Sequence, residues 1–98
     1  MKTITVVATF QARPEKEVEL RSALAGLLAP TRKEFGCLNY DLHQSPEEPG
    51  KFLFHENWTS QAALDAHLQS SHLKALLPRM EELCVAFPEI KIWERIDG

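Results

Sequence analysis

The chain is poor in cysteine, with two in 98 residues, Cys37 and Cys84. Two cysteines are too few for the disulfide framework of a small secreted domain, so we expect both thiols to be reduced. The longest apolar runs are a few residues, far below the roughly 20 needed to cross a bilayer. The first residues alternate polar and apolar and do not resemble a signal peptide. These absences predict a cytoplasmic protein without a membrane segment.

Long runs of one charge are also missing, since no run of like charges exceeds two residues. Eleven Lys and Arg stand against 14 Asp and Glu, a formal net charge of −3, which argues against binding to nucleic acid or to an anionic membrane. The chain also lacks the GxGxxG, P-loop and GxSxG motifs. We therefore expect no nucleotide cofactor and no serine-hydrolase chemistry.

The length and composition predict one globular domain spanning residues 1–98. Hydrophobic residues make up 44% and charged residues 26%, as in ordinary soluble domains. A chain this short buries only about two-thirds of its unfolded surface, so its own core is thin. Eight aromatic residues in so small a core suggest that further burial comes from a partner or a ligand.

The hydrophobic periodicity predicts the order β-α-β-β-α-β. The expected elements are a strand at 3–11, a helix that starts at Pro14 and is kinked or restarted at Pro30, strands at 37–44 and 51–58 joined by a turn, a helix at 61–68 capped by Ser60, a helix from Ser70 to Leu83 kinked at Pro78, and a strand at 89–96. Gly36 is expected to end the second helical segment, and Leu38, Tyr40 and Leu42 to share one strand face. This order is the ferredoxin-like α+β plan with an antiparallel sheet.

Both faces of the predicted sheet carry apolar side chains. Val7, Leu53 and Trp93 fall on the opposite strand parity from Ile4 and Phe54. Helices of this plan cover only one face, so the other face needs a second layer. We predict that an identical sheet supplies it and that the protein is a homodimer.

A candidate site lies on the strand at 51–58 and the helix after it. Phe52, Phe54, Glu56 and Trp58 share one strand face, which places a carboxylate between aromatic side chains. A buried charge needs a partner or a functional reason. Trp58 is expected either to contact a flat ligand or to fill the core. Tyr40 is likewise expected either to have a structural role or to contact a ligand.

The four histidines differ in their expected environments. His67 lies on the apolar side of its helix, either as a hydrogen-bonded core histidine or as a base in a pocket. His72 lies at a helix start, where it either caps or faces solvent, while His43 and His55 lie on the other sheet face. The spacing of His67 and His72 matches no common zinc motif, and we expect no metal site.

Three blocks of the sequence resemble the antibiotic biosynthesis monooxygenase domain family. They are Gly36-Cys37-Leu38-Asn39-Tyr40, then Glu56-Asn57-Trp58, then Ala66-His67-Leu68-Gln69-Ser70-Ser71-His72. The resemblance, closest to small bacterial quinol monooxygenases, implies a dimeric α+β barrel with a ligand cavity in each protomer. It also implies oxidation of a small quinol or phenol by dioxygen without a cofactor.

Carried onto this sequence, the resemblance implies His67 and Trp58 as catalytic residues and Tyr40, Phe54, Glu56 and His72 as substrate contacts. Phe54 replaces an asparagine found in the polyketide oxygenases of the family, and the first strand lacks the asparagine of its haem-degrading members. A non-catalytic small-molecule carrier or sensor and an isomerase remain alternatives. RNA binding is disfavoured by the negative charge and by a strand at 51–58 without glycine.

Overall fold

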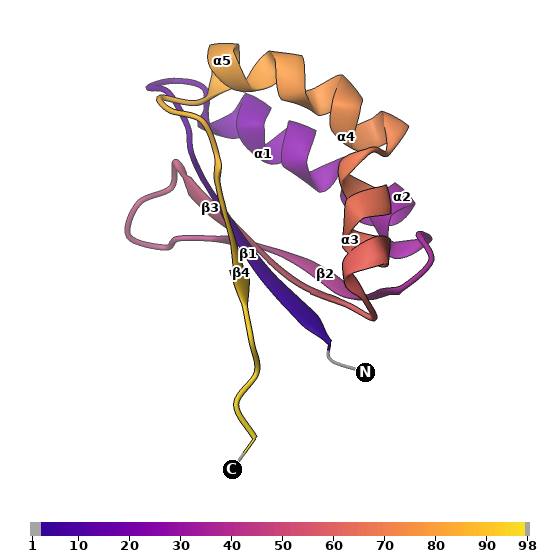
Figure 1. The fold of residues 1–98 in the computed structure, drawn as a ribbon. Helices are drawn as coiled ribbons and strands as arrows, with labels where there is room; N and C mark the ends of the chain where they lie inside the picture. The colour runs from indigo at the N-terminus through magenta and orange to yellow at the C-terminus, as the bar shows by residue number, and fades with distance from the viewer. Residues whose placement is uncertain (1–2, 98) are drawn as a thin grey trace.

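The computed structural model describes residues 3–97 and contains one four-stranded antiparallel sheet in the order β2-β3-β1-β4 (Figure 1). The elements are β1 (Ile4–Gln11), α1 (Glu17–Ala25), α2 (Leu28–Arg32), β2 (Cys37–Gln44), β3 (Lys51–Trp58), α3 (Gln61–Leu68), α4 (Ser71–Leu76), the 3₁₀ turn η1 (Leu77–Arg79), α5 (Met80–Leu83) and β4 (Glu89–Trp93). This order and topology confirm the predicted ferredoxin-like plan.

All the helices lie on one face of the sheet, and the core fills the space between the two layers (Figure 1). Strand alternation turns Val6, Ala8 and Phe10 of β1 toward the helices, where each is buried. The antiparallel register sets Ala8 opposite Phe54 and Phe10 opposite Phe52. The inner face of the two central strands is therefore apolar except at Glu56, which is 4% exposed.

The first helical segment begins later than predicted, but it restarts close to Pro30 as expected. The helix begins at Glu17 and not at Pro14, because Glu15 has a positive φ of 69° that no helix accommodates. The helix is interrupted at Gly26 and Leu27, and Pro30 lies in the first turn of the next helix, α2. The first-turn amides of a helix have no intrahelical acceptor, so Pro30 costs no hydrogen bond there.

A β-bulge at the start of β2 changes the expected position of Leu38. Cys37 pairs with Trp58 and Asn39 pairs with Asn57, so Leu38 is an extra residue in the ladder. Its side chain is 57% exposed and lies with Asn39 and Asn57 beside the outer sheet face. The expectation that Leu38 shares a face with Tyr40 was wrong, because strict alternation does not continue through a bulge.

The last helix and strand follow the prediction in outline. Pro78 lies in η1, which separates α4 from α5 as a proline kink does. Strand β4 ends at Trp93, three residues before the predicted end at Ile96. Between residues 3 and 97, no helix combines the length and hydropathy that a membrane crossing requires.

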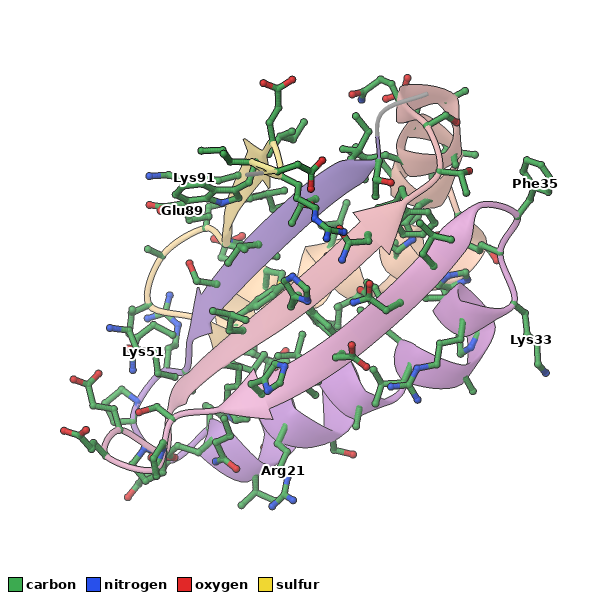
Figure 2. All side chains as sticks on the ribbon, turned by 90° about the horizontal axis from the view of Figure 1, so that it is seen from below. Arg21, Lys33, Phe35, Lys51, Glu89 and Lys91 are labelled. Carbon is green, nitrogen blue, oxygen red and sulfur yellow. The ribbon has the colours of Figure 1, made fainter. Side chains whose placement is uncertain are left out.

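The face of the sheet opposite the helices is covered by no element of the described chain (Figure 2). A ladder of polar side chains runs across it. The Thr5 hydroxyl donates to Asn57 Oδ1 at 2.6 Å, and Asn57 Nδ2 donates to Asn39 Oδ1 at 2.7 Å. The same face carries half-buried Val7 and Leu53 and the 55% exposed Trp93.

Candidate functional site

A cavity of about 260 Å³ lies between the inner face of the sheet and helices α3 to α5. It is lined by Val6, Ala8, Phe10, Leu27, Tyr40, Phe54, Glu56, Leu64, His67, Leu68, Leu73, Leu76, Leu77, Met80, Phe87, Pro88 and Ile90. Cavities that hold small molecules commonly measure about 300–1,000 Å³, so this one suits a ligand of one or two rings. Among these lining residues only Tyr40, Glu56 and His67 can ionise.

An aromatic wall forms one side of the cavity. The rings of Tyr40 and Phe54 are stacked with centroids 4.4 Å apart, and Phe10 meets Phe54 edge to face at 5.9 Å. Stacked and edge-to-face geometries are those that aromatic pairs prefer. Burial, together with the nearby Glu56 carboxylate, raises the pKa of Tyr40, so its hydroxyl stays protonated at neutral pH.

Glu56 is the acidic group of the cavity. Alternation along β3 turns its side chain to the inner face, and the Trp58 indole Nε1–H donates to its Oε1 at 2.9 Å. Burial raises the pKa of Glu56 to about 7, although the bond from Trp58 favours the charged form. At neutral pH this carboxyl therefore exchanges readily between its protonated and ionised forms.

His67 is 2% exposed and is held by a carboxylate from another part of the chain. Its Nδ1 lies 2.8 Å from Oε2 of Glu34, in the turn between α2 and β2. A carboxylate accepts hydrogen bonds, so Nδ1 carries the proton and the lone pair is on Nε2. Burial lowers the pKa of His67 despite the contact with Glu34, and the imidazole is neutral at pH 7.

The rings around His67 fix its orientation further. Trp58 lies at 4.7 Å and Tyr40 at 5.4 Å between ring centroids. Trp58, which is fully buried, thus contacts both His67 and Glu56. It is not among the residues that line the cavity and lies behind Glu56 and His67.

His72 shares the carboxylate of Glu34 with His67. Its Nε2 is 2.8 Å from the same oxygen, Oε2, and its side chain is 21% exposed. Oxygen and nitrogen atoms of Glu34, His67 and His72 lie within 4.8 Å of one another, and within the described part of the chain this is the one group that could hold a metal ion. The two imidazole N–H groups satisfy the carboxylate oxygen without one.

The fold therefore brings four of the six predicted site residues to one cavity. Tyr40, Phe54, Glu56 and His67 line it, whereas Trp58 lies behind it and His72 faces a separate hollow beside α1. Sequence reasoning missed Glu34. A glutamate in a turn gives no periodic signal, and its proximity to α3 and α4 arises only from tertiary packing.

Comparisons with known proteins identify relatives of this chain. The sequence profile of a family described as "Antibiotic biosynthesis monooxygenase" matches residues 3–79. Rv0793 of Mycobacterium tuberculosis, whose name provisionally assigns it to the monooxygenases, is 39% identical over 69 residues, covering 70% of this chain and 67% of that protein. The Synechocystis protein sll1783 is 31% identical over 91 residues, covering 93% of this chain.

The chain spans 62% of the length of sll1783. Among solved structures, PA3566 from Pseudomonas aeruginosa superposes with a TM-score of 0.94 at 33% identity. The superposition covers 99% of this chain and 97% of that one. The structure of Rv0793 also superposes on this chain, with a TM-score of 0.91, so sequence and fold agree on this relative.

Proposed function

We propose, from the premise that this chain belongs to the antibiotic biosynthesis monooxygenase family, that it oxidises a small quinol or phenol with dioxygen and without a bound cofactor. The observation that carries the proposal is the cavity itself. It is small, apolar and partly aromatic, and two groups that can accept a proton, Glu56 and His67, lie on its wall. Flat phenolic molecules match such a surface.

The reaction balances without an external reductant. A phenol with a free ring carbon reacts with dioxygen to give a quinone and water: one oxygen atom enters the ring and the other leaves as water. All four electrons come from the substrate. Loss of the hydroxyl proton gives an anion that passes an electron to dioxygen more readily, so the protein's task is to orient the ring, exclude water and hold that proton.

Each predicted site residue has a task in this proposal. Tyr40 and Phe54 contact the ring of the substrate, and Glu56 and His67 contact its hydroxyl groups. Trp58 acts on the reaction by holding Glu56 and packing against His67. His72 acts through Glu34, which it shares with His67, and is a positioning residue.

Oxygen uptake by chelator-treated protein with a panel of quinols and hydroxynaphthalenes tests the proposal. We expect enzyme-dependent uptake that is unchanged by chelation, and a loss of about 10²-fold in His67→Asn, which removes a hydrogen-bonding group from the cavity wall and lets the substrate shift out of position. To test Trp58 in the same assay, Trp58→Phe is preferable to Trp58→Ala, because alanine at a fully buried tryptophan costs about 3–5 kcal/mol of stability. Glu47→Gln, in the exposed turn after β2, is the control.

Other results of these assays would favour a different function. Turnover under anaerobic conditions would favour an isomerase, and tight binding of quinones without any chemistry would favour a carrier or sensor. Activity that disappears on chelation and returns with a metal ion would contradict the cofactor-free reaction and point to Glu34, His67 and His72.

The proposal includes a homodimer in the cytoplasm. The uncovered sheet face carries Val7, Leu53 and Trp93 together with polar groups that already bond to one another. A second copy can therefore cover that face without leaving those polar groups unpaired. The two cysteines form no disulfide, which is consistent with a reducing compartment.

A further inference from the structure

We propose that Glu56, and not His67, accepts the hydroxyl proton of the substrate. This inference rests on the proposed oxidation of a quinol or phenol and names the group that makes its first step work. The step breaks the O–H bond of the substrate and forms an O–H bond on Glu56, leaving the substrate as its anion. No electron moves in it.

The hydrogen bonds of Glu56 leave one oxygen for a ligand. Trp58 donates to Oε1 at 2.9 Å, and among residues 3–97 no group donates to Oε2. The side chain is 4% exposed and lies on the cavity wall. A buried carboxylate that has an unbonded oxygen and lines an apolar cavity is stabilised by a ligand that brings a hydroxyl donor.

The charge of the cavity also favours Glu56 over His67. Proton transfer to neutral His67 would create an imidazolium and a substrate anion while Glu56 still carried its own charge, so two anions would share one apolar cavity. Transfer to Glu56 moves one negative charge from the carboxylate to the substrate and creates no new one. Both routes leave the same net charge, but transfer to His67 adds a cation and an anion to an apolar cavity. Because each added charge must be desolvated there, transfer to Glu56 costs less.

The acid–base properties of the two groups agree with this assignment. Burial raises the pKa of Glu56 to about 7, which is close to the value that a base needs at neutral pH. Burial lowers the pKa of His67, which makes the imidazole a weaker base. With Nδ1 bound to Glu34, His67 is left to accept a hydrogen bond through Nε2 and to orient the substrate.

Binding of 4-nitrophenol, followed by difference infrared and visible spectroscopy, tests the inference without turnover. At a pH about one unit above the pKa of Glu56, both the carboxyl and the probe are largely ionised in solution. We expect the complex to take up about one proton per bound probe and to show a protonated-carboxyl band. The band should persist in His67→Asn and in Glu47→Gln, and it should be missing in Glu56→Gln.

Glu56→Gln keeps an oxygen that can accept the Trp58 bond, so the variant retains the packing of the site. A wild-type complex without the carboxyl band, the same band in Glu56→Gln, or a wild-type protein that does not bind the probe would overturn the inference. Proton uptake that requires His67 and not Glu56 would reassign the base to His67.

Turnover provides a second and separable test. Glu56→Gln should lower kcat/KM at least 10²-fold for a weakly acidic phenol, and much less for a phenol already ionised in solution, because that substrate needs no base. Equal losses for both substrates would indicate a merely structural role. If the wild type takes up no oxygen but shows the carboxyl band, the monooxygenase proposal fails and the role of Glu56 in binding stands.

Discussion

At the level of single residues, burial in an apolar cavity controls the protonation of the two candidate proton acceptors, Glu56 and His67. Glu56 and His67 are both buried against aromatic rings, and burial moves both toward their neutral forms. Glu56 accepts a hydrogen bond from the Trp58 indole, and His67 donates one to Glu34. Those bonds fix the side chains and leave one acceptor atom on each for a ligand.

The raised pKa of Glu56 predicts a pH-dependent cost in stability. Between pH 4.5, the ordinary value for the group, and about 7, the folded protein holds a proton that the unfolded chain has released. The free energy of unfolding therefore falls as pH rises through this window, by roughly 3 kcal/mol from this group. Glu56→Gln cannot ionise and should become progressively more stable relative to wild type over the same window.

Urea denaturation of both proteins between pH 4 and 8 measures this difference, with the exposed Glu47→Gln as the control, whose stability should stay parallel to that of the wild type. A stability difference between Glu56→Gln and wild type that does not change with pH would mean that Glu56 ionises normally in the folded protein.

At the element scale, the turn between α2 and β2 connects the sheet to the helical layer. Glu34 in this turn binds His67 of α3 and His72 of α4, and two residues later the backbone oxygen of Gly36 accepts from Thr59 at 2.9 Å. Gly36 has a φ of 83°, and a Cβ there would lie 2.5 Å from the Cβ of Ala63. The turn thus requires glycine for two reasons.

Gly36→Ala should destabilise the protein by roughly 2–4 kcal/mol, through strained backbone and through the clash with α3. Gly26→Ala is the matched control, since Gly26 has ordinary helical angles and its nearest atom to a new Cβ is 3.4 Å away. That substitution should be neutral or stabilising by about 0.4–1 kcal/mol. Thermal unfolding distinguishes them, and equal melting temperatures for the two variants would contradict the account of the turn.

Local pattern predicted the order of these elements but not their junctions. Alternation in β1 and β3 and the spacing of leucines in α1 follow from side chains that face one core, so they are visible in the sequence. The bulge at Leu38 and the left-handed Glu15 depend on how neighbouring elements meet. Phe54, Glu56 and His67 lie on regular elements with a clear inner face, so their place on one candidate site could be predicted. Glu34 lies in a turn, and its contact with α3 and α4 could not be predicted.

At the scale of the whole molecule, the sheet has one covered and one uncovered face (Figure 2). A stable dimer buries about 800 Å² on each partner, an area that an open sheet face can supply. Leu53, on the uncovered face of the central strand β3, lies opposite Thr9 of β1 and His43 of β2. It is well placed for contact with a second copy.

Leu53→Glu should convert the proposed dimer to a monomer, because the substitution would bring a charge from each copy into the proposed interface. Light scattering after size-exclusion chromatography measures the mass directly. Val18→Glu, on an exposed position of α1, should leave the mass unchanged. A wild-type protein with the mass of a single chain would contradict the dimer.

If the proposed function is right, the cavity supports oxygen transfer with no group other than the chain and its substrate. The most direct measurement is turnover of a hydroxynaphthalene by chelator-treated protein under isotopically labelled dioxygen, with mass spectrometry of the quinone and of the water. We expect one labelled atom in the quinone and one in water for each substrate consumed. Quinone without label, or no oxygen consumption by the chelator-treated protein, would contradict it.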